Sequence, residues 1–176
     1  SELPLIEQNV WRADAVERTE ERGADGLAGE TVTSRLEARA LARLIEETPG
    51  AIAWISFSCR DGERIADGTP LAAVVRELEP VDGLVAIGVN CTAPRHVAPL
   101  LGLASSETAR PLVAYPNSGE AGDAGRRRGT AAAEGRDCAV AEEWRDLGAR
   151  LVGGCCRTGP DDIRSLRGRL LPRSRE

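Results

Sequence analysis

Residues 84–94, Leu-Val-Ala-Ile-Gly-Val-Asn-Cys-Thr-Ala-Pro, are the stretch that decides the fold. The apolar run over 84–89 predicts a buried β-strand, and the polar residues 90–92 end it. The residues that follow, Pro94 to Ser105, are predicted to form a helix. A strand followed at once by a helix is the repeating unit of a parallel α/β fold, because the crossover helix lets the next strand run in the same direction.

The same rhythm extends in both directions along the chain. Helical spacing predicts that the helix over 34–47 turns one side inward, and that the helix beginning at Thr69-Pro70 has Thr69 as N-cap and proline as its first residue. Residues 119–136, rich in Gly, Ala and Arg, are predicted to be a flexible loop. The other predicted strands cover 26–30, 51–57, 111–115 and 149–153, and the other predicted helices cover about 10–22, 137–147 and 161–171. The predicted inward residues are Leu36, Ala40, Leu41, Leu44 and Ile45 in the first of these two helices and Leu71, Val74, Val75 and Leu78 in the second.

Five strands alternating with helices predict the α/β class with parallel βα units. Periodicity alone leaves two architectures open, a doubly wound sheet and part of a (β/α)8 barrel. No Gly-x-Gly-x-x-Gly or P-loop pattern follows the first strand, which argues against a nucleotide-binding fold.

Composition narrows the class of protein. The chain has 176 residues, 41% hydrophobic and 29% charged, which favours one soluble domain over residues 1–176. A net charge of −5 argues against a nucleic-acid partner. No apolar run is long enough to span a membrane and no signal peptide is visible, so we expect a cytoplasmic protein. The absence of methionine and an aromatic content of 3% fit a piece of a longer protein.

Polar and thiol residues recur where the predicted strands end. The carboxyl ends of parallel strands share one rim, which carries the active site in folds of this kind. We therefore expect these side chains to lie close together. They are Glu30-Thr31, Ser58-Cys59, Asn90-Cys91, Asn117-Ser118 and Cys155-Cys156.

Three of these thiols could meet across the rim. Cys91, Cys155 and Cys156 would bind Zn²⁺ and leave one tetrahedral position open, which is typical of a catalytic rather than a structural zinc. Two other interpretations stay open at this point: packed, inert thiols, or a redox-active pair formed by Cys155 and Cys156.

Longer segments around these cysteines resemble the homocysteine S-methyltransferase family. The resemblance rests chiefly on Ala86-Ile-Gly-Val-Asn-Cys-Thr-Ala-Pro94 and Gly153-Gly-Cys-Cys-Arg-Thr158, which are similar to the two zinc-binding signatures of the family. It extends over nearly the whole chain, and it looks closest to the members that use S-methylmethionine or S-adenosylmethionine. The supporting segments are Glu30-Thr31 with Glu37-Ala38, Trp54-Ile-Ser-Phe-Ser-Cys59 with Asp61-Gly62 and Asp67-Gly-Thr-Pro70, and Tyr115-Pro-Asn-Ser-Gly-Glu120.

This resemblance implies a partial (β/α)8 TIM-type barrel, about strands 4 to 8. It implies an enzyme that uses Zn²⁺, held by Cys91, Cys155 and Cys156, to transfer a methyl group from a sulfonium donor to the thiol of homocysteine, giving methionine. The small-molecule partners would be homocysteine and the methyl donor. No catalytic residue beyond the metal site is implied. The implied substrate-binding residues are Glu30, for the homocysteine ammonium, and more loosely Asn90, Asn117 and Ser118.

The sequence also departs from the family. The N-terminal part of the barrel is missing, Gly29 replaces a bulky residue, and residues 121–136 lack an expected tryptophan. A partial barrel would expose sheet edges and favour self-association through them. The alternatives are therefore a truncated, non-catalytic zinc-binding remnant, or a thiol-redox protein. Cys59 and Cys138 are interpreted as bystanders, and His96 as structural.

Overall fold

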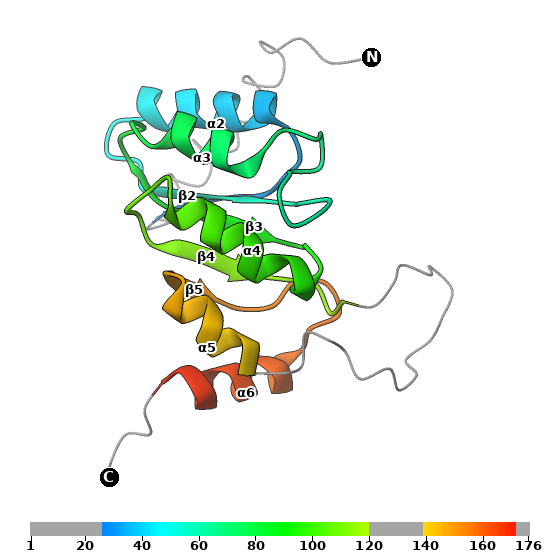
Figure 1. The fold of residues 1–176 in the computed structure, drawn as a ribbon. Helices are drawn as coiled ribbons and strands as arrows, with labels where there is room; N and C mark the ends of the chain where they lie inside the picture. The colour runs from blue at the N-terminus through cyan, green and yellow to red at the C-terminus, as the bar shows by residue number, and fades with distance from the viewer. Residues whose placement is uncertain (1–25, 120–138, 172–176) are drawn as a thin grey trace.

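The computed structural model describes residues 26–119 and 139–171, which form a five-stranded sheet with helices between the strands (Figure 1). All four strand pairs are parallel, and the strands follow one another across the sheet in chain order. The predicted α/β class with parallel βα units is confirmed. The elements are β1 (Leu27–Val32), α2 (Arg35–Glu47), β2 (Ala53–Phe57), α3 (Leu71–Leu78), β3 (Leu84–Asn90), α4 (Pro94–Ser105), β4 (Leu112–Tyr115), α5 (Ala139–Asp146), β5 (Ala149–Val152) and α6 (Pro160–Leu170).

Helix α2 begins where the sequence predicts it. Ser34 has an extended backbone, and its side chain accepts a hydrogen bond from the backbone N–H of Glu37, which satisfies one of the free donors of the first turn. Ala40 and Ile45 are buried as predicted, but the predicted inward position of Leu36 is wrong, since its exposure is 38%. The other buried residues of α2 are Ala38 and Ala42.

Helix α3 differs from the prediction at its first residue. Pro70 takes the N-cap position, one residue later than predicted, and no side chain caps the helix. Thr69 is not the N-cap, because its carbonyl accepts from the N–H of Ile65 in the preceding turn, and the Pro70 carbonyl accepts the first bond of the helix, from Val74. The predicted inward face is confirmed, since Leu71, Val74, Val75 and Leu78 are all buried.

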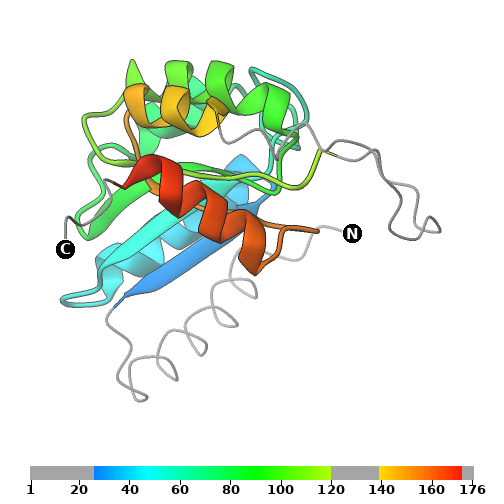
Figure 2. The same cartoon turned by 90° about the horizontal axis from the view of Figure 1, so that it is seen from below.

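The hydrophobic core lies between the sheet and the helices. Ile55, Phe57, Ile87 and Val89 point from the strands into this layer. Figure 1 shows α2, α3, α4 and α5 following one another along one side of the sheet, and Figure 2 shows α4 and α5 side by side. Because side chains alternate along a strand, the residues next to these core positions belong to the opposite face, where the polar residues described below are found.

The sheet is curled. Neighbouring strands lie about 4.8 Å apart, so β1 and β4 would be separated by about 14 Å in a flat sheet. Nevertheless the Tyr115 hydroxyl on β4 donates a 3.0 Å hydrogen bond to Glu30 Oε1 on β1. Because side chains stand roughly perpendicular to a sheet, this contact across three strand spacings indicates that the strands bend around the face that carries them. This face is the concave side of an arc, as in a barrel.

Some predictions fall outside the described residues. They are the helix over 10–22 and the loop over 119–136, apart from Gly119, together with the first residues of the helix predicted over 137–147. None of the described helices is long and apolar enough to cross a membrane.

Candidate metal centre

Three thiols meet at the carboxyl end of the sheet. The Sγ atoms of Cys91, Cys155 and Cys156 all lie within 4.8 Å of one another. Cys91 Sγ is 3.4 Å from Cys156 Sγ, which is 3.9 Å from Cys155 Sγ. Tetrahedral Zn²⁺ with bonds of about 2.3 Å to sulfur places its thiolates about 3.8 Å apart. The two measured separations lie on either side of that value, so the three sulfurs fit one zinc ion with small adjustments.

Cys91 is held in an unusual backbone conformation. It follows the last residue of β3 with φ +47, in the left-handed region that non-glycine residues seldom occupy. Its N–H donates to the carbonyl of Tyr115 (3.1 Å), and its carbonyl accepts from Asn117 Nδ2 (3.1 Å). Both partners come from the end of β4. The neighbouring strand therefore fixes the turn that directs the Cys91 side chain.

The loop after β5 carries the other two thiols and is tied to the same segment. The N–H of Cys155 donates to the carbonyl of Pro116 (2.8 Å), and the carbonyl of Cys156 accepts from the N–H of Ser118 (3.0 Å). Thr158 closes the turn, since its hydroxyl donates to the Cys155 carbonyl at 2.6 Å. Residues 115–118 thus bind the backbones of all three cysteines, although they contribute no sulfur.

The electrostatics of the thiol cluster favour a cation. Desolvation, followed by the two adjacent thiols, raises the pKa of Cys91 to about 12. Without a cation the Cys91 thiol is therefore protonated at neutral pH. A divalent ion among the three sulfurs reverses this effect, because its charge stabilises the thiolate form.

Cys59 and His96 lie apart from the cluster. Cys59 is not a member of the three-thiol group; its N–H is bonded to the Thr92 hydroxyl, and burial raises the pKa of its thiol to about 12. His96 lies in the first turn of α4, near Gly62. The interpretations of Cys59 as a bystander and of His96 as a structural residue stay predictions. Cys138 lies outside the described residues.

Asn90 joins the metal centre to the first strand. Its Oδ1 accepts from the Thr31 N–H (2.8 Å) and from the Ser56 hydroxyl (3.0 Å), and its Nδ2 donates to Thr31 Oγ1 (2.8 Å). Thr31 has φ +55, which is costly for a β-branched residue, and the register of β1 against β2 shifts between Gly29 and Val32. The Asn90 amide therefore stabilises a kink in β1 immediately after Glu30.

The predicted substrate residues occupy two places. Glu30 is exposed on the concave face, where its carboxylate accepts from Tyr115. Asn90 is buried, and Asn117 and Ser118 adjoin the cysteine loops. All four lie at the predicted rim, and a role in binding substrate stays a prediction for each of them.

The sequence did not single out Ser56, Trp54 and Tyr115 as site residues. The Tyr115 hydroxyl lies 2.6 Å from Ser56 Oγ and accepts from Trp54 Nε1 at 3.3 Å. One signal was available, because Tyr115 is the only tyrosine of the chain and ends a strand next to Asn117-Ser118. The contacts of its hydroxyl to β1 and β2 depend on the curvature of the sheet, which periodicity does not contain.

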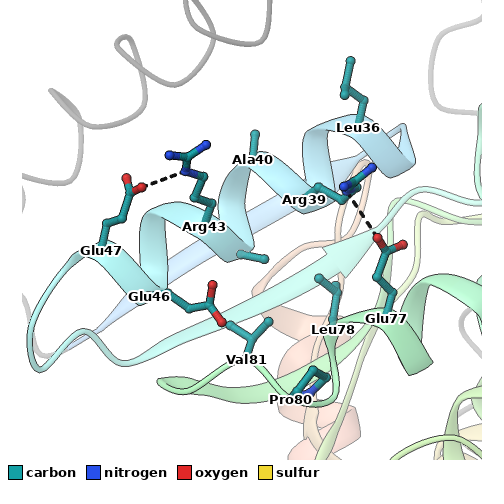
Figure 3. A pocket seen from close by; sticks show the side chains of 11 residues that line it. Leu36, Arg39, Ala40, Arg43, Glu46, Glu47, Glu77, Leu78, Pro80 and Val81 are labelled. Atoms are coloured by element: carbon teal, nitrogen blue, oxygen red, sulfur yellow. Dashed lines mark hydrogen bonds and ion pairs between the residues drawn. The ribbon is translucent and has the colours of Figure 1, made fainter.

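A groove on the helix side of the molecule is separate from this rim. Figure 3 shows it between α2 and the end of α3, with a volume of about 590 Å³. Arg39 pairs with Glu77 and Arg43 with Glu47 along its border, over an apolar floor that includes Leu78 and Val81. It contains no thiol and lies apart from the chemistry described above.

Comparison with known proteins gives a consistent result. The sequence model of the family described as homocysteine S-methyltransferase matches residues 7–170. Homocysteine S-methyltransferase YbgG of Bacillus subtilis is 44% identical over 168 residues, which are 94% of this chain and 52% of the relative. Homocysteine S-methyltransferase of Escherichia coli is 44% identical over 158 residues, 88% of this chain and 50% of the relative. The chain thus spans about half the length of the curated relatives it matches.

The fold has the same relatives. The crystal structure of the homocysteine methyltransferase MmuM from Escherichia coli in its metallated form superposes with a TM-score of 0.83 at 37% identity, covering 96% of this chain and 53% of that one. Together with the parallel order and the curl of the sheet, this match confirms the predicted partial (β/α)8 barrel.

Proposed function

The chain belongs to the homocysteine S-methyltransferase family, and from that premise we propose that it binds one Zn²⁺ through Cys91, Cys155 and Cys156 and transfers a methyl group to the thiol of homocysteine. The observation that carries the proposal is the approach of the three sulfurs to within 4.8 Å at the carboxyl rim of the sheet.

The donor set supports zinc as the metal. Thiolate sulfur is a soft ligand that selects zinc over calcium or magnesium, and three protein ligands leave one tetrahedral position for a substrate. When bound, such an ion supplies Lewis acidity that lowers the pKa of a coordinated substrate thiol. A reducing compartment would keep the three ligands as thiols, which is consistent with a cytoplasmic location.

The proposed reaction balances without a side-chain acid. The homocysteine thiol loses its proton to solvent, and its sulfur forms a bond to the methyl carbon of a sulfonium donor such as S-methylmethionine or S-adenosylmethionine. The bond from that carbon to the donor sulfur breaks and its electron pair stays on the donor, which leaves as a neutral thioether. Because this leaving group needs no proton, the site requires no general acid.

The protein's own residues would bind and orient the amino acid. The Glu30 carboxylate, exposed on the concave face, is the proposed partner of the homocysteine ammonium. Asn117 and Ser118 would support the substrate end of the site from the segment that already positions the cysteines. Asn90 would act beside them by fixing the strand end that carries Glu30.

The first test is the metal content of the purified chain. We expect about one zinc per chain, lost in Cys91→Ser, because two thiolates hold the ion far more weakly than three. Cys59→Ser is the matched control, since it removes a thiol from the end of the adjacent strand but outside the cluster. Metal analysis of both variants decides the question. A chain without zinc but with a titratable disulfide would instead support a thiol-redox function.

The second test is chemical. Methionine formation from homocysteine with each sulfonium donor would identify the methyl donor and separate an enzyme from a non-catalytic zinc-binding remnant. The assay should be run on the chain alone and with the N-terminal half of a relative added. Zinc binding without methionine in either mixture would contradict the proposed methyl transfer.

A further inference from the structure

The Glu30 carboxylate is held by a hydrogen bond from the side chain of Tyr115. Its Oε1 accepts a 3.0 Å hydrogen bond from the Tyr115 hydroxyl. Among the described residues, the other carboxylate oxygen of Glu30, Oε2, has no hydrogen-bond partner. It can therefore accept a hydrogen bond from a ligand. The carboxylate is exposed, and an exposed glutamate without such a bond would sample several rotamers.

The phenol is itself fixed from several directions. Trp54 Nε1 donates to it at 3.3 Å, and Ser56 Oγ lies 2.6 Å away. The backbone carbonyl of Tyr115 accepts from the N–H of Cys91, at the metal centre. A rigid tyrosine thus connects the carboxylate on β1 with the strand end that places a metal ligand.

The Ser56 hydroxyl completes the connection. It lies 3.0 Å from Asn90 Oδ1, and Asn90 holds the backbone of Thr31 just after Glu30. Asn90 therefore positions the backbone of the Glu30–Thr31 kink and Tyr115 positions the carboxylate of Glu30, while Ser56 contacts both Asn90 and Tyr115. Such a network preorganises a ligand contact, because no reorganisation is needed when the ligand arrives.

We propose that Tyr115 is a positioning residue that holds the Glu30 carboxylate toward the primary ammonium group of the thiol substrate. The inference rests on the proposed function and deepens it. It assigns recognition of the amino group to Glu30 together with Tyr115, rather than to the Glu30 carboxylate alone. Tyr115 touches neither the reacting sulfur nor the methyl group; it acts through Glu30.

Ligand binding to the Co²⁺-loaded full chain tests the inference without turnover. Thiol binding perturbs the visible absorption of Co²⁺ held by thiolates. Two probes are titrated: homocysteine, and the analogue of homocysteine that lacks the amino group. We expect Tyr115→Phe to reduce the preference for homocysteine over the analogue by about three- to tenfold, the net effect of one ordinary hydrogen bond. Affinity for the analogue and the Co²⁺ content should stay unchanged.

Glu30→Gln provides the matched comparison. It should lose the same preference, and adding Tyr115→Phe to it should cause no further loss, because the tyrosine acts through the missing charge. An unchanged preference in Tyr115→Phe overturns the inference, and so does an equal loss of affinity for both thiols, which would indicate a general structural role. A wild-type chain that takes up no Co²⁺, or whose Co²⁺ spectrum responds to neither thiol, overturns the proposed function and the inference with it.

Discussion

Cysteines that follow different strands of the sheet have different surroundings in this chain. Cys59 is packed against the core, whereas Cys156 is exposed beside two other thiols. Alkylation requires a thiolate, so environment decides which residue reacts. The sequence separated the three predicted ligands from Cys59 and Cys138, but it could not predict how readily each thiol is alkylated, because the burial of a thiol depends on the elements packed around it.

We predict that a neutral alkylating agent modifies Cys156 well before Cys59 in the metal-free chain. Burial raises the pKa of Cys59 to about 12, which lowers its thiolate fraction at neutral pH at least about a hundredfold relative to an unperturbed thiol. Peptide mass spectrometry over a time course measures both sites. Zinc should protect Cys156 and leave Cys59 unchanged. Equal rates at the two sites would show that Cys59 is not buried as described.

At the scale of the elements, strands β3 and β4 approach so closely that position 88 has room only for glycine. A Cβ on Gly88 in β3 would lie 2.0 Å from the backbone oxygen of Val113 in β4. Backbone cannot move aside as a flexible side chain can, so strands β3 and β4 would have to separate. These are the strands whose ends carry Cys91 and the segment over 115–118 that positions it.

Gly88→Ala should therefore destabilise the chain by more than about 3 kcal/mol, or prevent folding, because overpacking against backbone is among the most costly changes. Gly102→Ala is the matched control. It lies within α4, has open space around its Cβ position, and should stabilise by about 0.5–1 kcal/mol through helix propensity. Urea unfolding measures both. Similar midpoints for the two variants would contradict the close packing of β3 on β4.

Element types were predictable because the pattern repeats. Runs such as 84–89 and 112–115 are apolar and bounded by turn residues, and α4 covers the predicted range. Details at the ends were less predictable. Thr69 has the chemistry of an N-cap, but its carbonyl accepts from Ile65 in the preceding turn instead of from the helix, so the helix begins one residue later. Leu36 has helical spacing, but it is exposed, and Ala38 and Ala42 are buried instead.

At the scale of the whole molecule, the metal centre joins distant parts of the chain. Cys91 follows β3 and the other two ligands follow β5, with β4 between them. A ligand that binds only the folded chain stabilises it, and zinc at a hundredfold excess over its dissociation constant adds about 2.7 kcal/mol. For a chain of this size that corresponds to roughly 5–10 °C in unfolding midpoint.

We predict that zinc raises the thermal unfolding midpoint of the wild type and of Cys59→Ser, but not of Cys156→Ser. The increment should shrink as the pH falls, because the three thiols must lose their protons to bind the ion and acid opposes that loss. Calorimetry with and without a chelator at several pH values measures this. An equal increment in both cysteine variants would place the zinc elsewhere.

At the same scale, the outer strands of the sheet have edges that could pair with another chain. Among the described residues, β1 and β5 each pair with one neighbour only. An unpaired edge can accept a strand of another chain, so self-association through these edges remains a proposal.

The sequence by itself determined the order and type of the elements, the parallel sheet, and which polar residues end its strands. These follow from local periodicity and from the geometric rule that parallel strands share a carboxyl rim. The tertiary structure decided which rim residues meet. The curl of the sheet brings Tyr115 to Glu30 across three strand spacings, and the left-handed turn at Cys91 directs one thiol toward two others. Both depend on how far the strands bend and on hydrogen bonds between distant segments. Neither can be predicted from the spacing of apolar and polar residues in the sequence.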